Sequence, residues 1–170
     1  MQAVVKTADP AESDERLDHV RPLYLESLTL VERLHRCLLD VIKDEFDRRN
    51  CADINSVQAL LLYNIGDDEL TASELSTRGY YLGSNVSYNL KKLVEMGFIN
   101  HQRSRFDRRT VRVKLTEKGR DARAIVDALY QKHVCTVERV GGINSQDFVT
   151  LNKALHRLER FWTDQILYRL

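Results

Sequence analysis

The 170-residue sequence has little of what interrupts helices, since it contains 7 glycines and 2 prolines. Both residues disfavour helix interiors, so their scarcity beside abundant Leu, Arg, Glu and Lys predicts a mainly helical chain. No stretch approaches the roughly 20 apolar residues of a membrane-spanning helix. The first 16 residues lack the apolar core of a secretory signal. We therefore expect a soluble, cytoplasmic protein with no membrane partner.

Cysteines are also few and widely separated: Cys37, Cys51 and Cys135. An odd number without a C-x-x-C spacing disfavours a disulfide framework and fits a reducing compartment. We interpret the three as small, commonly buried residues. A redox-sensing thiol is the alternative.

Catalytic and metal-binding motifs are missing as well. The histidines form no H-x-x-x-H pair and no cluster with cysteine, which disfavours a zinc site. Neither a phosphate-binding glycine loop nor a nucleophile elbow occurs. The sequence therefore predicts no enzyme activity, no metal and no cofactor. The five histidines are His19, His35, His101, His133 and His156.

The net charge is only +1, although nucleic-acid-binding domains often have a large basic excess. The charge is unevenly distributed, because the N-terminal segment is acidic whereas residues 103–114 contain one acid, Asp107. Such a one-signed cluster indicates a surface that attracts an anion. Its basic members are Arg103, Arg105, Arg108, Arg109, Arg112 and Lys114.

Apolar periodicity and capping residues predict six helices. We expect residues 1–16 to form a flexible arm and a long helix to cover 23–46, with Pro22 near its first turn. A second helix begins at the cap Asn55, and a short third one runs from Thr71 to about residue 79. The other three begin at Gly83-Ser84, Thr116 and Ser145. Between the fourth and fifth, residues 98–99 and 111–115 read as the two strands of a hairpin.

Two short helices followed by a hairpin with a basic tip describe a winged helix-turn-helix. The helix over 84–96 has Val86, Leu90 and Leu93 spaced to face the body. Its outer side is free of acids until Glu95, as expected for a helix that enters the major groove of DNA. An ordinary amphipathic surface helix is the alternative. The candidate DNA-binding residues of this helix are Ser84, Asn85, Ser87, Tyr88, Lys91 and Lys92, and Asn89 also faces outward.

The hairpin supplies the remaining candidates for DNA binding: Arg103, Arg105, Asp107, Arg108 and Arg109. An arginine at the tip of a β-ribbon can enter a narrow minor groove, where negative potential concentrates. We assign that role to Arg109. Asp107 either braces the arginine or simply favours the turn.

The stretch 71–119 resembles the MarR family of bacterial regulators. LTASELSTRGYYLGSNVSYNLKKLVEMGFI matches the helix-turn-helix of the family, and FDRRTVRVKLTEKG matches its wing, with Asp107 and Arg109 as the D-x-R pair. The resemblance implies a homodimer in which the first, fifth and sixth helices interleave, and a pseudo-palindromic operator in double-stranded DNA. The implied division is 1–16 arm, 17–50 first dimerisation helix, 51–116 DNA-binding domain and 117–170 C-terminal dimerisation helices.

One segment departs from most members of the family, because GYYLGSN at 79–85 replaces an apolar residue, a glycine and a Ser-rich turn. The chain resembles an alphaproteobacterial LdtR-like subgroup in this segment and in three others, RPLYLESLTLVERLH, QALLLYNIG and LERFW. That resemblance implies a ligand-responsive repressor of cell-wall or stress-response genes. Because of this departure, the base contacts of typical family members do not transfer directly to this sequence.

The family resemblance also implies a small aromatic effector bound between the dimerisation and DNA-binding parts. Candidates for that pocket are Ile42, Phe46, Leu60 and Tyr63. Aromatic and aliphatic residues at helical spacing form ordinary core more often, so that interpretation stays open.

Two rival functions remain beside a ligand-responsive regulator. The first is a cysteine-based redox-sensing repressor, although peroxide sensors of the family use a cysteine near the start of the first helix and Cys37 lies well inside it. The second is a winged-helix protein-interaction module without DNA binding, which predicts weak duplex binding with little dependence on salt.

Overall fold

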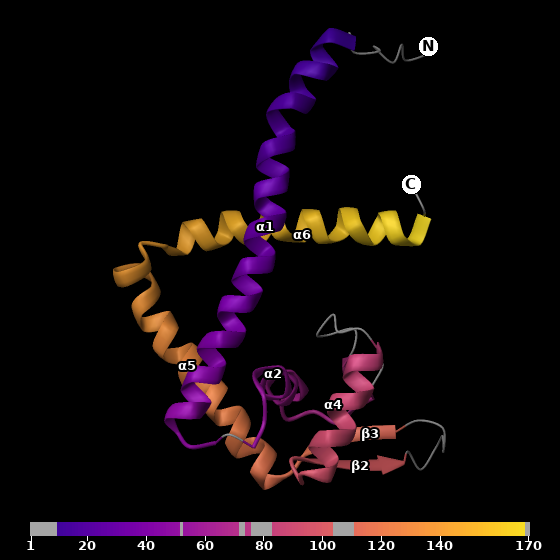
Figure 1. The fold of residues 1–170 in the computed structure, drawn as a ribbon, viewed down its shortest axis with the longest axis vertical. Coiled ribbons are helices and arrows are strands. Elements are labelled where there is room, and N and C mark those ends of the chain that lie inside the picture. The colour runs from indigo at the N-terminus through magenta and orange to yellow at the C-terminus, as the bar shows by residue number, and fades with distance from the viewer. Residues whose placement is uncertain (1–9, 52, 72–73, 76–82, 104–110, 169–170) are drawn as a thin grey trace. The chain divides into compact units, whose positions relative to one another are not determined.

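The computed structural model describes residues 10–51, 53–71, 74–75, 83–103 and 111–168. Two compact units make up the chain, Met1–Gln58 and Ala59–Leu170. Figure 1 labels the helices and the strands β2 and β3. None of the described helices is long and apolar enough to cross a membrane.

The first unit consists mainly of helix α1, Pro10–Arg48. It starts earlier than predicted, so residues 10–16 are helical and do not belong to a flexible arm. Pro10 fits the first helical position, where a missing N–H costs no intrahelical bond. Pro22 lies inside the helix and not in its first turn. Because proline has no N–H, the carbonyl of Asp18 lacks its helical hydrogen bond. Asp18 is exposed, so water can bond to this carbonyl, which reduces the destabilisation by an interior proline.

Helix α2, Ser56–Ile65, begins at the predicted cap. Asn55 Oδ1 accepts from the backbone N–H of Gln58 at 2.9 Å, and Gln58 Oε1 accepts from that of Asn55 at 3.1 Å. This reciprocal capping box satisfies two backbone donors that the helix leaves open. The helix ends before Gly66, whose φ of 65° is a left-handed conformation suited to glycine.

The second unit contains a small antiparallel sheet with strand order β1-β3-β2. Strands β2, Ile99–Arg103, and β3, Val111–Leu115, form the predicted hairpin. The third strand, β1, Leu70–Thr71, was not predicted, and it pairs with β3. Two residues are too few to show an alternating pattern, and their partner lies far along the chain. The sheet therefore ties the helix-turn-helix to the hairpin.

Three further helices belong to this unit: α4, Gly83–Glu95; α5, Glu117–Gly141; and α6, Ser145–Tyr168. Helix α4 contacts β2, and α5 contacts β3. Thr116 caps α5 as predicted, and Gly142 ends it in the left-handed conformation. The cap of α6 was predicted wrongly: Asn144, not Ser145, accepts from the backbone N–H groups of Gln146 and Asp147. Serine and asparagine are both common helix caps, so the sequence alone does not distinguish Asn144 from Ser145. The hydrogen bonds identify Asn144 as the cap.

The described part of the chain thus has five helices where six were predicted. The missing one, the short helix from residue 71 to about 79, lies mostly outside the described residues. Its predicted start is formed, because Thr71 Oγ1 accepts from the N–H of Glu74 at 3.1 Å. Glu74 Oε2 accepts in return from the N–H of Thr71 at 2.7 Å. Glu74 and Leu75 are helical.

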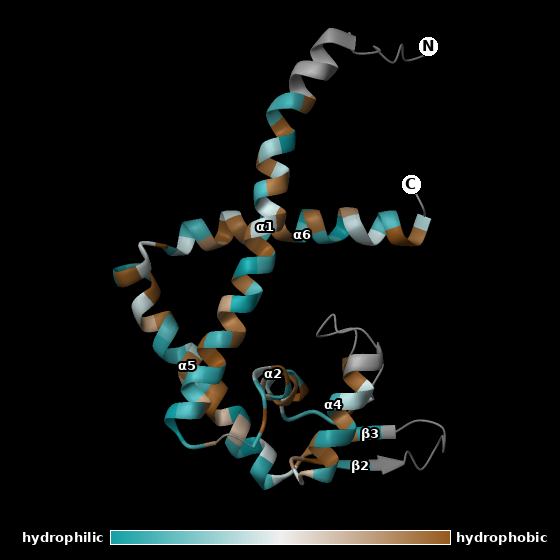
Figure 2. Ribbon diagram, viewed as in Figure 1, coloured by the Kyte–Doolittle hydropathy of each residue, from teal (hydrophilic) through white to brown (hydrophobic). Residues whose placement is uncertain are grey.

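The core of the second unit collects aliphatic side chains from each of these elements except α6. Fully or almost fully buried are Leu61, Leu62, Ile65, Leu75, Val86, Leu93, Ile99, Val113 and Val126. Figure 2 also shows apolar residues along α6 and along the coloured part of α1. In α6, however, none of the described residues is buried, so this helix has an apolar stripe without a cover in the single chain.

Candidate nucleic-acid interface

Helix α4 has the two faces that the sequence predicts. Val86, Leu90 and Leu93 are buried and fix the helix on the body through its contact with β2. Ser87, Tyr88 and Lys91 are exposed on the other side, with Tyr88 62% exposed. A large tyrosine left in solvent beside a serine and a lysine suits a surface that contacts phosphates and bases. Ser84 and Asn85 belong to the first turn of α4 by their backbone, and their side chains lie outside the described part.

Lys92 on this helix is engaged within the protein, which the sequence interpretation missed. Its Nζ lies 3.0 Å from Glu95 Oε2. The hydrogen bond and charge of Glu95 raise the pKa of Lys92, and Lys92 lowers the pKa of Glu95 in turn. Both stay charged at neutral pH, so Glu95 offsets part of the positive charge that Lys92 brings to the helix. The spacing of three residues along a helix was the available signal.

Successive residues of the hairpin strands point to opposite faces of the sheet. The pairs Ile99–Leu115 and His101–Val113 lie on one face, and Asn100–Lys114 on the other. Ile99, Val113 and Leu115 are buried, so their face is the inner one. Arg103 is the last residue of β2, opposite Val111. The tip beyond it lies outside the described residues, and with it the predicted Arg105, Asp107, Arg108 and Arg109.

Two basic residues of β3 lie on the outer face of the hairpin and were not among the predicted contacts. Arg112 is half-buried, and its Nη1 donates to the carbonyl of Glu69 at 3.5 Å. Lys114 is exposed.

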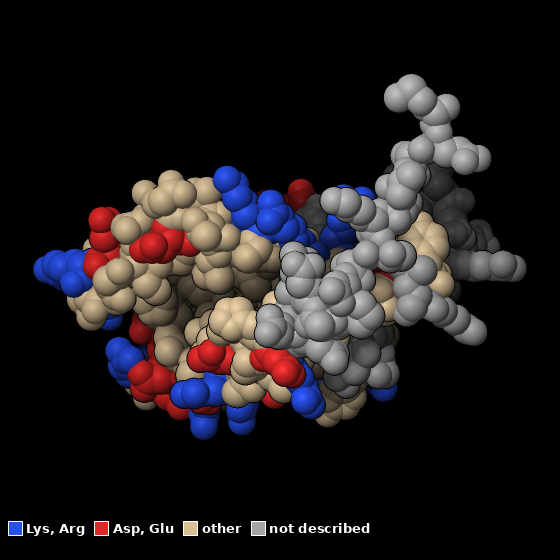
Figure 3. Space-filling model, turned by 90° about the horizontal axis from the view of Figure 1, so that it is seen from above, with Lys and Arg blue, Asp and Glu red and all other residues tan. Residues whose placement is uncertain are grey.

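On the face of the molecule in Figure 3, lysines and arginines lie beside aspartates and glutamates. The described surface therefore has no large patch of one sign in this view.

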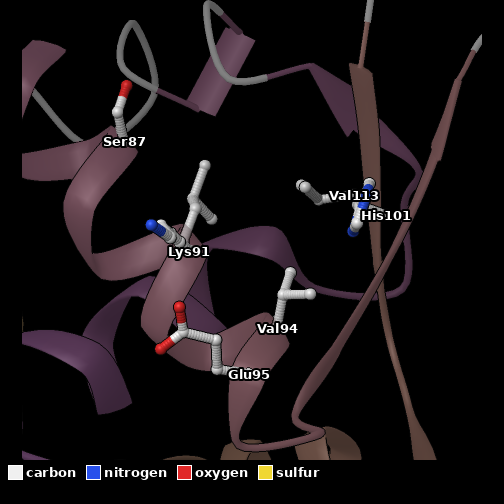
Figure 4. Close-up of a pocket in the computed structure, with 7 residues that line it drawn as sticks. Ser87, Lys91, Val94, Glu95, His101 and Val113 are labelled. Carbon is white, nitrogen blue, oxygen red and sulfur yellow. The ribbon is translucent and has the colours of Figure 1, made fainter.

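A groove separates α4 from the hairpin, with a cavity volume of about 450 Å³. Leu90, Val94 and Val113 form its apolar lining. Figure 4 shows Ser87, Lys91 and Glu95 on the helix side and His101 on the strand side. The groove thus joins two predicted DNA contacts, Ser87 and Lys91, to a histidine that the sequence interpretation did not assign. No local pattern could reveal this, because the hairpin register brings His101 there.

Comparison with known proteins agrees with this geometry. Residues 54–119 match the family model "Winged helix DNA-binding domain". The chain is 32% identical over 163 residues to the exopolysaccharide II synthesis transcriptional activator ExpG of Rhizobium meliloti (strain 1021), covering 96% of this chain and 84% of that protein. The chain belongs to the winged-helix transcriptional regulators.

Solved structures show that the regulator has the fold of the MarR family, as the resemblance predicted. FabT of Streptococcus pneumoniae in complex with DNA superposes with a TM-score of 0.65 at 22% identity, over 83% of this chain and 98% of that one. MarR of Staphylococcus aureus in complex with salicylate and kanamycin superposes with a TM-score of 0.67 at 22% identity, over 86% and 97%. These structures establish the architecture, and the DNA-binding assignment itself rests on the matched winged-helix domain and on ExpG.

The four candidates for an effector pocket are divided between the two units of the regulator. Ile42 and Phe46 belong to the first unit and Leu60 and Tyr63 to the second. The first three are buried. The ring of Tyr63 meets that of Tyr130 edge-on, with centroids 5.0 Å apart. A pocket shared by all four stays a prediction.

All three cysteines of the regulator are free thiols. Cys37 and Cys135 are exposed and Cys51 is half-buried, so the expectation of buried cysteines was wrong for the single chain. Cys37 lies in α1 and Cys135 in α5, and both helices have exposed apolar side chains such as Leu34 and Val134. Within the described residues, no three His, Cys, Asp or Glu side chains are grouped so as to hold a metal ion.

Proposed function

We propose that the regulator reads a pseudo-palindromic operator as a homodimer, with α4 in the major groove and the hairpin tip in the adjacent minor groove. The observation that carries this proposal is the exposed row Ser87, Tyr88 and Lys91 on a helix whose opposite face is buried. Base readout falls to Ser84 and Asn85 at the start of the helix, since N-terminal residues reach deepest into the groove. Arg103, Arg105, Arg108 and Arg109 contact the backbone and minor groove, with Asp107 bracing the tip.

The homodimer is supported by the apolar stripe of α6. Leu151 and Leu155 are 46% and 40% exposed, and Phe148, Leu158 and Trp162 continue the row at spacings of three and four residues. A stripe of this length on a monomer indicates an interface. A twofold dimer would place two copies of α4 about one helical turn of DNA apart, which explains why we expect a pseudo-palindrome.

The regulated genes are proposed to concern the cell envelope. The segment GYYLGSN and its neighbours resemble the LdtR-like subgroup, whose name-giving member regulates a cell-wall enzyme, and the relative ExpG is named for exopolysaccharide synthesis. The sequence favoured a repressor, whereas ExpG is an activator by name. The sign of regulation therefore depends on where the operator lies relative to the promoter. A regulator that acts on such genes works in the cytoplasm.

An aromatic acid is the proposed class of effector. The support is the MarR-type fold, together with a fold neighbour that was solved with salicylate. Ile42, Phe46, Leu60 and Tyr63 are the candidates to line its pocket. Such a ligand regulates only if it binds the DNA-competent and incompetent conformations with different affinity.

Footprinting on the regulator's own promoter region, with and without aromatic acids, tests the proposal. We expect protection of two half-sites about one helical turn apart. Arg109→Ala should weaken operator binding while the dimer stays intact, and Asn85→Ala should weaken operator binding more than binding to random duplex. Unchanged affinity in Arg109→Ala, or equal losses on both duplexes in Asn85→Ala, would refute the corresponding role.

A further inference from the structure

His101 is a polar side chain in a mainly apolar row of the hairpin. It lies on the inner face of the hairpin, in the row that contains the buried Ile99, Val113 and Leu115. Yet His101 is exposed, because it borders the groove between α4 and the hairpin. The imidazole is therefore available to a ligand that enters the groove.

In the docking proposed above, one strand of the DNA duplex passes over this groove. Each sugar-phosphate backbone separates a major groove from a minor groove. A protein that places α4 in the major groove and the neighbouring hairpin tip in the minor groove must therefore straddle one backbone. The surface between the helix and the hairpin faces the phosphates of that strand. In this structure that surface is the groove lined by Ser87, Lys91 and His101.

The side chains at the rim of the groove have the chemistry that phosphates require. Lys91 supplies a positive charge, and the hydroxyl of Ser87 and the imidazole of His101 are hydrogen-bond donors. Among the described residues that line the groove, Glu95 is the one acid, and its Oε2 is engaged by Lys92 Nζ at 3.0 Å. On the strand side, His101 faces the uncharged Val113, while Lys114 alternates to the opposite face of the sheet.

We propose that this groove is the channel for the DNA backbone and that His101 is a phosphate ligand whose protonation strengthens DNA binding. The inference rests on the proposed docking of α4 and the hairpin. Imidazole changes charge between pH 5 and 8, and an imidazolium forms a charge-assisted bond to phosphate that a neutral ring lacks. Affinity for any duplex should therefore rise as the pH falls, and the contact should be independent of base sequence.

Fluorescence anisotropy with a labelled random-sequence duplex tests the inference on the full-length protein. Between pH 8 and pH 6, the wild type should gain roughly tenfold to a hundredfold more affinity than His101→Gln, as expected for two charge-assisted bonds, one in each protomer. At pH 6, the slope of log K against log salt should be smaller by about 1.8 in His101→Gln, the value for one lost phosphate contact in each protomer. His101→Lys should bind tightly at both pH values.

His156→Gln is the matched control, because His156 is an 80% exposed histidine on α6 and should keep the pH response and slope of the wild type. Thermal unfolding of the variants checks that they fold. If the wild type lacked steep salt dependence altogether, the proposed function would fail. If the wild type bound well and His101→Gln kept the same pH response and slope, only the role of His101 would be overturned.

Discussion

Gly119, in the first turn of α5, lies directly against the carbonyl group of Phe98, the residue that precedes β2. A Cβ on Gly119 would overlap the carbonyl oxygen and lie 3.2 Å from the carbonyl carbon. Phe98 also receives the side chain of Lys118, whose Nζ lies 4.1 Å from the ring centroid. This close approach connects the hairpin to the long helix that follows it.

Replacing Gly119 with alanine should therefore destabilise the fold. The overlap is with backbone atoms, which yield only if the strand or the helix shifts, and overpacking of this kind costs about 1–3 kcal/mol. Urea denaturation followed by circular dichroism measures the loss. The control is Gly141→Ala at the other end of α5, where a Cβ would meet Val137 Cγ2 at an ordinary 3.6 Å. A loss in Gly119→Ala no larger than that of the control would contradict the packing described.

The hydroxyl of Thr116 holds the same junction. Its Oγ1 donates to the carbonyls of Gly97 and Phe98, 2.7 and 3.1 Å away, and accepts from the N–H of Gly119 at 3.1 Å. Thr116→Val keeps the shape of the side chain and removes this cap, so we expect a loss of about 1–2 kcal/mol in the free energy of unfolding.

Thr136→Val is the control for this loss, because Thr136 is a half-buried threonine of α5 whose hydroxyl bonds back to the carbonyls of Lys132 and His133 in its own helix. Its unfolding free energy should stay within about 0.5 kcal/mol of the wild type. Equal effects of the two substitutions would rule out a special role for Thr116.

Removing the charge of Glu95 should strengthen DNA binding. Glu95 borders the groove and pairs with Lys92, and its lowered pKa keeps it ionised at neutral pH. Glu95→Gln abolishes its repulsion of phosphate and releases Lys92, which should improve duplex affinity about twofold to fivefold at low salt. The gain should shrink as salt rises, because exposed charges are screened. The control is Glu138→Gln, at an exposed site on α5, which should leave the affinity unchanged. Weaker DNA binding by Glu95→Gln would argue against α4 as the DNA-facing helix.

An acid in the stripe of α6 should dissociate the dimer. Leu155→Glu places a charge at an apolar position that we propose to be buried between protomers, and an unpaired buried charge is strongly unfavourable. Sedimentation velocity should show monomers at concentrations where the wild type is dimeric. Lys153→Glu introduces the same acid at an exposed polar site and should stay dimeric. Identical sedimentation of both variants would place the interface elsewhere.

The parts of this fold that were predictable from the sequence are those determined within a few residues. The caps at Asn55, Thr71 and Thr116 bond to the third residue beyond them, and the inner face of α4 follows from helical periodicity. Strand β1 was not predictable, because only its pairing with the distant β3 defines it.

For the site, the sequence predicted correctly that Ser87, Tyr88 and Lys91 face outward, but it did not predict the ion pair between Lys92 and Glu95; whether these residues contact DNA stays a prediction. The role proposed for His101 was not predicted, for a physical reason. It depends on the register that sets His101 opposite Val113 and on the packing of β2 against α4. Neither feature leaves a local pattern in the sequence.

The central claim is that α4 and the hairpin contact the backbone of duplex DNA, and the salt dependence of binding tests it most directly. Anisotropy titrations of the wild-type protein on a duplex from its own promoter region should give a straight line of log K against log salt. We expect a slope of about −5 or steeper, which corresponds to roughly six neutralised phosphates over two protomers. Weak binding with a slope near zero would contradict the account and favour a winged-helix module that binds protein instead of DNA.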